Sequence, residues 1–182
     1  HPAVRAADIL HCHNLHGGYF NPFSLSVLSH QKPTVWTLHD MQAITGRCAH
    51  AFDCEKWMSG CGGCPYPRTP PEAWTDRTGE LWAHKQLIYA HAKLHIVVPS
   101  RWLQRKVEHS LLRDHPVTLV ANGVDCDVFR PAERSTARAR FGIPEGAVVV
   151  GCLSHGGALV NPWKGGHHLQ RALQEMRRRH PG

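Results

Sequence analysis

Short apolar runs alternate with longer amphipathic segments through the first two thirds of this chain. Four runs rich in β-branched and other apolar residues have the length of buried strands, namely ADILHCH (7–13), PTVWTLHD (33–40), LHIVVPS (94–100) and PVTLVANG (116–123). Helical patterns lie between them, at 19–30, at 79–93 and after Ser100, whose hydroxyl can cap the next helix. Strands that alternate with helices usually pair in parallel. The sequence therefore predicts an α/β fold with a parallel, doubly wound sheet.

A second unit of the same kind follows. After a short basic helix that ends near Gly142, the run AVVVGCLSHGG (147–157) reads as a new strand, and a helix is predicted from about Lys164. This is the pattern of a first βα unit of another α/β domain. The chain begins with HPAVRAADIL, without a Met, and stops just after this last helical pattern. We therefore expect it to be an internal part of a longer protein.

The charge of the chain is basic and uneven. Lys and Arg number 21 against 14 Asp and Glu, a net charge of +7, and most of the excess lies beyond residue 100. Such an excess favours anionic partners, which include phosphates, nucleic acid and acidic lipid headgroups. The alternative is that the Arg residues are solvated helix faces. No apolar run reaches the ~20 residues that a membrane-spanning helix needs.

The segment 41–72 interrupts the alternation and holds four of the seven cysteines, Cys48, Cys54, Cys61 and Cys64. Its glycines and charges predict a loop outside the core. The cysteines are compatible with a structural zinc site, with two disulfides or with redox chemistry. Four thiolates that include one C-x-x-C pair suit tetrahedral zinc, and His50 could replace one ligand. The overall spacing, C-x5-C-x6-C-x2-C, is not that of a standard zinc ribbon.

Several of these motifs, in this order, resemble glycosyltransferase family 4. They are TVWTLHD, the cysteine-rich segment, VANGVDCDVFRP and VVVGCLSHGGALVNPWKGGHHLQRAL, and the resemblance is greatest to the exopolysaccharide and colanic-acid type enzymes. It implies the GT-B fold, in which two Rossmann-like domains face each other across a cleft. Residues 1–122 would be the later part of the acceptor-side domain, 123–146 the interdomain hinge, and 147–182 the start of the donor-binding domain. It also implies transfer of a sugar, with retention of configuration and no required metal cofactor.

The resemblance assigns roles to polar residues at the ends of two predicted strands. His39 would lie beside the acceptor and the transferred sugar, where a neutral imidazole can accept a proton from an acceptor hydroxyl or orient it. Asp40 would fix the tautomer of His39. His13 and Asn14 end the preceding strand and would line the same edge, since open α/β sheets bind ligands at the carboxyl ends of their strands. A strand-end His that only caps a loop is the structural alternative.

The donor phosphate would be bound at the start of the last helix. Lys164 matches the family lysine, and Gly165 and Gly166 would let the helix N-terminus approach the phosphate. Many relatives also carry an Arg after the glycine of the preceding strand, which GCLSHGG lacks, so Ser154, His155 or backbone amides would take its place. Asn122, Gly123 and Asp125 would form the turn into the hinge, where glycine permits a positive φ. Ala121 stands where relatives usually have Pro.

The implied partners are a nucleotide-sugar donor and a glycan or lipid-linked acceptor. We expect a cytoplasmic protein with peripheral contact to the acidic inner membrane, a compartment that disfavours disulfides and leaves structural zinc or reduced thiols. The insert would overhang the acceptor site. Two alternatives are a zinc-stabilised nucleic-acid-binding module and a non-catalytic GT-B-like scaffold. Against nucleic acid, the aromatic residues Trp36, Trp82, Tyr89 and Trp102 fall at core-like positions of the predicted strands and helices. We expect this chain alone to be inactive, with no metal required for the reaction.

Overall fold

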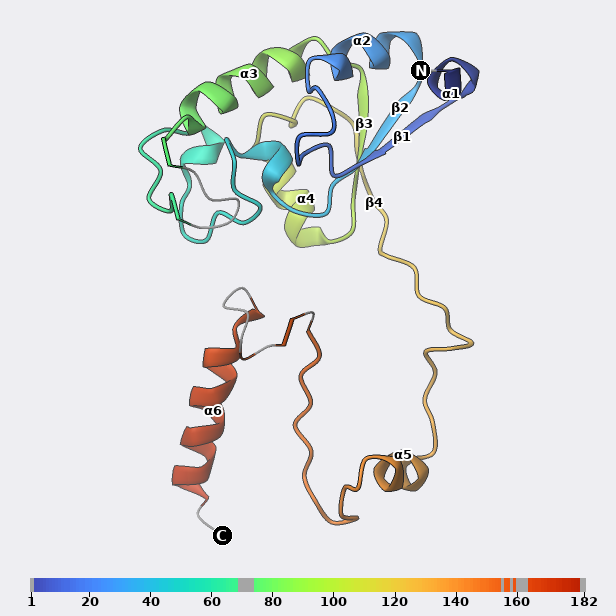
Figure 1. The fold of residues 1–182 in the computed structure, drawn as a ribbon, viewed down its shortest axis with the longest axis vertical. Coiled ribbons are helices and arrows are strands. Elements are labelled where there is room, and N and C mark those ends of the chain that lie inside the picture. The colour runs from blue at the N-terminus through green and yellow to red at the C-terminus, as the bar shows by residue number, and fades with distance from the viewer. Residues whose placement is uncertain (1, 69–73, 155, 158, 160–163, 181–182) are drawn as a thin grey trace. The chain divides into compact units, whose positions relative to one another are not determined.

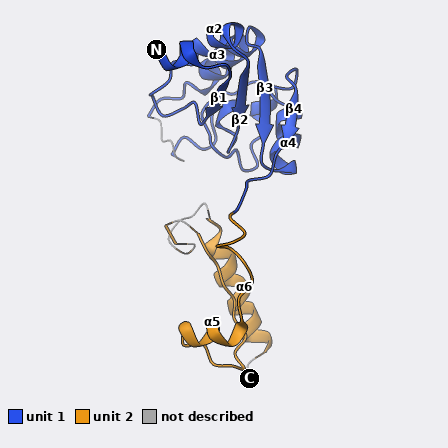
Figure 2. Cartoon of the chain, turned by 90° about the vertical axis from the view of Figure 1, so that its right-hand side faces the viewer, with its two compact units in different colours: residues 1–124 blue, residues 125–182 orange. Residues whose placement is uncertain are grey.

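The computed structural model describes residues 2–68, 74–154, 156, 157, 159 and 164–180. The chain divides into two compact units, residues 1–124 and residues 125–182 (Figure 2). The division lies close to the predicted start of the hinge at residue 123.

The first unit is built on four parallel strands. They are β1 (Leu10–His13), β2 (Thr34–Thr37), β3 (Leu94–Val98) and β4 (Val117–Leu119). They pair in the order β1-β2-β3-β4, and every pair is parallel. The predicted α/β class with a parallel sheet is confirmed. The order runs in one direction only, so the reversal that defines a doubly wound sheet does not occur among the described strands.

Three helices connect these strands, namely α2 (Ser24–Gln31), α3 (Thr78–Ala90) and α4 (Arg101–Glu108). They lie on one side of the sheet (Figure 1), as right-handed connections between strands added in one direction require. The predicted cap at Ser100 is confirmed, because its hydroxyl oxygen accepts a hydrogen bond from Leu103 N at 3.3 Å. A short helix, α1 (Pro2–Ala6), precedes β1 and was not predicted.

The core lies between the sheet and these helices. Alternate residues of β3 are buried, with Ile96 and Val98 at 0% exposure, and Val107 of α4 is as deeply buried. The intervening position of β3, His95, is exposed, as are His11 and His13 of β1. The predicted core positions of Trp36 and Tyr89 are confirmed, and Trp82 is half-buried. Trp102 is a correction, because 41% of it is exposed: it lies in the first turn of α4, outside the stripe of Leu103 and Val107.

The start of the cysteine-rich insert belongs to the core, which corrects the prediction of an outside loop. Residues 41–47 are buried except Gln42, and they include the 3-10 helix η1 (Gln42–Ile44). A second 3-10 helix, η2 (Lys56–Met58), buries Trp57. Gly46 lies so close to the start of α3 that a Cβ atom there would be 2.3 Å from the carbonyl oxygen of Thr78. Sequence periodicity could not reveal this packing, because irregular backbone has no repeat.

In its described residues the second unit forms the α-helices α5 (Arg134–Arg140) and α6 (Gly166–Arg179), and both were predicted. The predicted strand at 147–157 does not form in the described residues. Val148 is 90% exposed and Leu153 100% exposed. A strand is stable only when it pairs with another, and the described part of this unit has no second strand.

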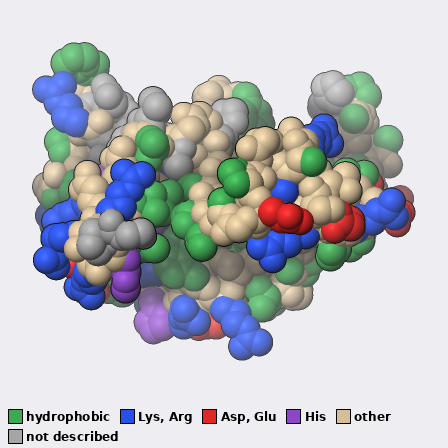
Figure 3. Space-filling model, turned by 90° about the horizontal axis from the view of Figure 1, so that it is seen from below, with side chains coloured by type: hydrophobic (Ala, Val, Ile, Leu, Met, Phe, Trp, Pro, Cys, Tyr) green, Lys and Arg blue, Asp and Glu red, His purple; other side chains and the backbone are tan. Residues whose placement is uncertain are grey.

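Many Lys and Arg side chains are exposed at the surface. In the view of Figure 3, Lys and Arg side chains lie in several separate groups, and some of them adjoin Asp or Glu. No helix in the described parts of the chain is long and apolar enough to cross a membrane.

Candidate active site

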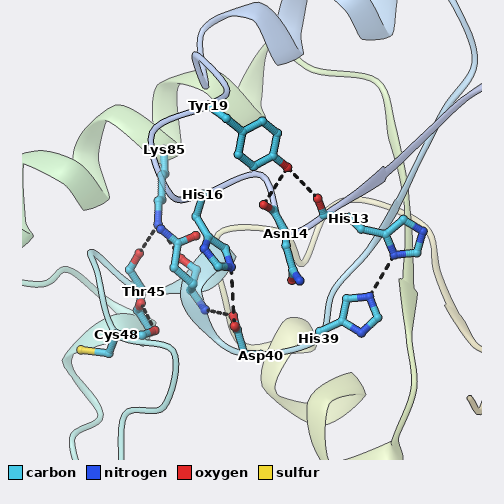
Figure 4. Close-up of polar contacts among 10 residues, drawn as sticks. His13, Asn14, His16, Tyr19, His39, Asp40, Thr45, Cys48 and Lys85 are labelled. Carbon is cyan, nitrogen blue, oxygen red and sulfur yellow. Dashed lines mark hydrogen bonds and ion pairs between the residues drawn. The ribbon is translucent and has the colours of Figure 1, made fainter. Parts of the chain in front are cut away.

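Two histidines meet where β1 and β2 end. His13 is the last residue of β1 and pairs in register with Thr37, the last residue of β2, and His39 follows two residues later. Nδ1 of His13 lies 2.9 Å from Nε2 of His39, and the rings stack with centroids 5.2 Å apart (Figure 4). Both side chains are exposed. The structure therefore brings together two residues that the sequence placed at the same edge of the sheet.

This hydrogen bond defines what His39 can do. One of the two nitrogens must donate and the other accept, so the protonation of His13 selects the tautomer of a neutral His39. If His39 donates through Nε2, its Nδ1 keeps a lone pair that can accept a proton. If His39 accepts, its Nδ1–H can donate to an oxygen. Either state suits the positioning of a hydroxyl group.

Asp40 does not contact the ring of His39 in the way that the sequence suggested. Its Oδ1 accepts a hydrogen bond from Gln42 N at 2.8 Å, and its Oδ2 lies 3.7 Å from Nε2 of His16 (Figure 4). The short Asp side chain closes a turn onto the backbone two residues ahead, as Asp does at the start of turns. The ring partner of His39 is therefore His13, which sequence reasoning had treated only as a neighbour.

The turn after β1 is held in an uncommon conformation. Asn14 has a φ of 44°, in the left-handed region that costs energy for residues other than Gly. The hydroxyl of Tyr19 lies 2.8 Å from the carbonyl oxygen of Asn14 and 3.0 Å from that of His13, and it can donate to either. A small hollow next to this turn is lined by Asn14 and His16 on one side and by His39 and Asp40 on the other. A site for a small polar group is thus prepared at this edge.

Lys85 binds the backbone next to the site, and sequence reasoning missed it. Its Nζ donates to the carbonyl oxygens of Gln42 at 2.5 Å and of Thr45 at 2.8 Å, so it fixes the backbone that follows Asp40 (Figure 4). Burial lowers the pKa of Lys85 to about 8, against an ordinary value of 10.5. The spacing of Trp82, Lys85 and Tyr89 was the available signal, since it places the lysine on the buried stripe of α3.

The four cysteines of the insert are half-buried and form no disulfide. Burial raises the pKa of Cys48 and of Cys61, and the neighbouring cysteines raise that of Cys48 further. The backbone N–H of Gly46 donates to Sγ of Cys61 at 3.2 Å. Among the described residues, no group of three or more His, Cys, Asp or Glu is arranged to hold a metal ion. Zinc therefore stays a prediction, and binding it would require the sulfur atoms to move together.

The predicted phosphate-binding residues belong to the second unit, whereas His13 and His39 belong to the first. Lys164 is exposed, and Gly165 is the N-cap of α6 with a φ of 68°, which glycine adopts without strain. Gly166 is the first residue of α6 and is buried. Ser154 has a buried hydroxyl oxygen without a hydrogen-bond partner in the described structure, and His155 lies outside the described residues.

The predicted hinge turn is exposed, and one detail of it is corrected. The carboxylate of Asp125 accepts hydrogen bonds from Asp127 N at 2.9 Å and Val128 N at 3.2 Å, so it caps the turn. Asn122 and Gly123 are exposed. Gly123 does not have a positive φ, and a Cβ atom there would meet nothing within 4 Å, so this position does not require glycine.

Residues 3–128 match the family model described as Glycosyltransferase Family 4. The chain is 31% identical over 160 residues to the "Putative colanic acid biosynthesis glycosyl transferase WcaC" of Escherichia coli (strain K12), a match over 82% of this chain and 39% of the relative. It is 48% identical over 60 residues to a D-inositol 3-phosphate glycosyltransferase of a Nocardioides species, 33% of this chain and 12% of the relative. The chain thus spans about two fifths or less of the length of these relatives. No solved structure matches it significantly.

Proposed function

The chain belongs to glycosyltransferase family 4, and from this we propose that it forms the acceptor side of an enzyme that moves a sugar from a nucleotide-sugar to a hydroxyl group. Family membership implies a nucleotide-sugar donor and an acceptor in general terms. The proposal is finer: transfer with retention of configuration, to a glycan or lipid-linked acceptor, in polysaccharide biosynthesis. The printed name of the colanic acid relative supports that last point.

The observation that carries the proposal is the hydrogen bond between His13 and His39. It orients the ring of His39 at the carboxyl edge of a parallel sheet, which is where such sheets bind their ligands. A positioned imidazole can orient an acceptor hydroxyl or accept its proton while the new bond forms. Asn14 and His16 line the adjoining hollow and offer further polar contacts to the same hydroxyl.

The donor phosphate would be stabilised from the second unit. Breaking the bond between the sugar and the diphosphate leaves negative charge on the phosphate, and cations and backbone N–H groups lower the energy of that charge. Lys164 supplies a cation, and the N-terminus of α6 at Gly165 and Gly166 supplies N–H groups. We propose that both units take part in one reaction.

The proposal is tested by removing His39 in the full-length protein. We expect His39→Ala to lower kcat roughly 10²-fold, because a positioned acid–base group is lost. The affinity for the nucleotide-sugar should hardly change. The assay measures release of nucleoside diphosphate and incorporation of labelled sugar from UDP- and GDP-sugars, with lipid and glycan extracts as acceptors.

His95→Ala is the matched control. His95 is an exposed strand histidine of the same sheet, but its Nε2 pairs with Thr118 Oγ1 at 2.8 Å, away from the site. Its removal should leave turnover within a factor of about two. Equal turnover of His39→Ala and the unmodified protein would remove His39 from the reaction and return it to a structural role.

A further inference from the structure

Four aromatic side chains meet on the surface where the cysteine-rich insert contacts the first turn of α4. We call His50, Phe52, Tyr66 and Trp102 the aromatic platform. The rings of His50 and Trp102 are almost parallel, with an angle of 8° and centroids 5.7 Å apart. Phe52 packs edge-on to His50 at 5.0 Å and contacts Tyr66 at 5.2 Å. Yet 48% of Phe52 and 41% of Trp102 remain exposed, so the cluster does not bury its own apolar surface.

The backbone holds this cluster in place at an energetic cost. Phe52 has a φ of 51°, a left-handed conformation that is rare for a bulky residue. Its backbone N–H donates to Nδ1 of His50 at 3.0 Å, which ties the ring of His50 to the backbone of Phe52. The ammonium group of Lys106 lies 6.0 Å from the centre of the Trp102 ring and 5.2 Å from that of Trp57. Strain of this kind persists where the surrounding structure enforces it, and it is concentrated at functional sites.

The aromatic platform lies at the same edge of the sheet as His39. Met41 N donates to the carbonyl oxygen of Ala49 at 2.9 Å, so the residue before His50 is paired with the segment that follows His39. Trp102 lies in the first turn of α4, which begins directly beyond the carboxyl end of β3, the neighbour of β2. Figure 1 shows the insert and α4 next to each other at this end of the strands.

We propose that the aromatic platform binds the sugar ring of the acceptor. This inference rests on the proposed glycosyl transfer and specifies its acceptor as a pyranoside. The apolar C–H face of a pyranose ring stacks on flat aromatic surfaces, while its hydroxyls need polar partners around them. The platform offers both, because its rim carries the imidazole of His50 and the carboxylate of Asp53, which accepts a hydrogen bond from the hydroxyl of Tyr66.

The chemistry fits a sugar better than the other occupants of an exposed aromatic patch. The exposed rings belong to one small cluster with polar groups at its rim, whereas stable protein interfaces bury about 800 Å² on each partner. A membrane surface favours aromatic and aliphatic side chains flanked by many cations. Here the flat rings of His50 and Trp102 dominate, and Asp53 places a negative charge at the rim.

The test follows Trp102 directly in the full-length protein labelled with 5-fluorotryptophan. The probes are the methyl pyranosides of glucose, galactose and mannose, with glycerol as a hydroxyl-bearing compound without a ring. At least one glycoside should shift the ¹⁹F resonance of Trp102 with saturation, and glycerol should not. The resonance of Trp36, which is buried in β2, serves as the internal control.

Two variants measure the contribution of the platform. Phe52→Asn removes a ring but keeps a residue that tolerates a left-handed φ, so the fold should be retained. We expect the dissociation constant of the glycoside to rise roughly 3- to 10-fold, which corresponds to the loss of one aromatic contact. Trp74→Ala, the matched control, should leave it unchanged.

The outcomes separate this inference from the proposed function. Glycoside binding at Trp102 in a protein that transfers no sugar would refute glycosyl transfer and leave the sugar site standing. Sugar transfer without any glycoside-dependent shift of Trp102 would overturn the sugar site alone. A Trp102 shift caused by phosphatidylglycerol vesicles, and by none of the glycosides, would also overturn it and identify the patch as a membrane contact.

Discussion

Nδ1 of His13 and Nε2 of His39 share one hydrogen across 2.9 Å, and their rings stack at an angle of 25°. His13 is in turn packed against His11, with ring centroids 4.3 Å apart, and Nε2 of His11 pairs with Thr37 Oγ1 at 2.8 Å. The imidazole of His39 is therefore oriented by a row of side chains that begins in β1. The position of β1 therefore sets the orientation of His39, the residue that we propose contacts the acceptor.

His13→Phe tests that connection. The ring still stacks on its neighbours but offers no nitrogen to His39. A hydrogen bond contributes about 0.5–1.5 kcal/mol net, so kcat should fall roughly 2- to 10-fold, less than in His39→Ala. The same transfer assay measures it, with His95→Phe as control. A loss as large as that of His39→Ala would mean that His13 itself contacts the reacting groups.

The lowered pKa of Lys85 should make its contribution to the free energy of unfolding increase as the pH rises above 7. Because burial lowers its pKa in the folded state to about 8, against 10.5 ordinarily, the unfolded chain binds more protons between these values. The contribution of Lys85 to the free energy of unfolding should therefore rise by on the order of 1 kcal/mol between pH 7 and about 9. Burial also raises the pKa of the thiols of Cys12, Cys48 and Cys61 above the ordinary 9.0, so the unfolded chain releases their protons first and stability is lost as the pH approaches 9. This loss opposes the gain from Lys85.

Urea denaturation at a series of pH values measures this gain, and Lys85→Met is the comparison. The variant loses the ammonium group that binds Gln42 and Thr45, but it retains most of the apolar stem. The variant lacks the Lys85 contribution, so the unmodified protein should gain on the order of 1 kcal/mol relative to it between pH 7 and about 9. A gain of equal size in the variant would assign the effect to another group.

We expect the cysteine-rich insert to bind about one zinc ion per chain. The four thiols are half-buried, and burial keeps Cys48 and Cys61 in the protonated, unreactive form until a metal displaces their protons. Metal analysis of protein purified without chelator gives the zinc content. The exposed Cys126 and Cys152 should react first with a thiol reagent, and a chelator should expose four more thiols. Zinc-free protein in which all seven thiols react at one rate contradicts this prediction.

Residues 1–182 on their own should not bind a nucleotide-sugar. Gly166 is the one buried residue in the described part of the second unit, and Lys164 is exposed. An ion pair between an exposed lysine and a phosphate contributes roughly 0–1 kcal/mol, because water screens it. Calorimetry with UDP- and GDP-sugars should therefore show no heat of binding. Micromolar affinity would place the donor site elsewhere in the chain.

The sequence was most informative where local pattern and tertiary packing agree. The run LHIVV forms β3 because alternate residues such as Ile96 and Val98 find helices to pack on. The equally apolar run AVVV stays outside any strand because the described second unit has no partner strand. Apolar character thus predicts that a segment needs burial, but pairing decides whether a strand forms.

The sequence predicted where the site lies, but it did not predict which side chains contact each other there. That His13 and His39 end adjacent strands follows from the parallel sheet, so their proximity could be expected. Their ring-to-ring bond depends on side-chain rotamers, which the sequence does not specify. Asp40 illustrates the same limit, because its carboxylate accepts a hydrogen bond from the backbone N–H of Gln42, two residues ahead, and not from His39. The role of Lys85 could not be predicted without knowing that the insert packs on α3.

The contact between Gly46 and Thr78 restricts how this region can diverge. Because a side chain at position 46 would collide with the carbonyl oxygen of Thr78, the insert and the first turn of α3 can change only together. Loop grafting between family members would accordingly have to exchange residues 41–78 as one cassette. An insert transplanted without its matching helix start would have lost the surface on which it folds, and acceptor preference could not be moved with it.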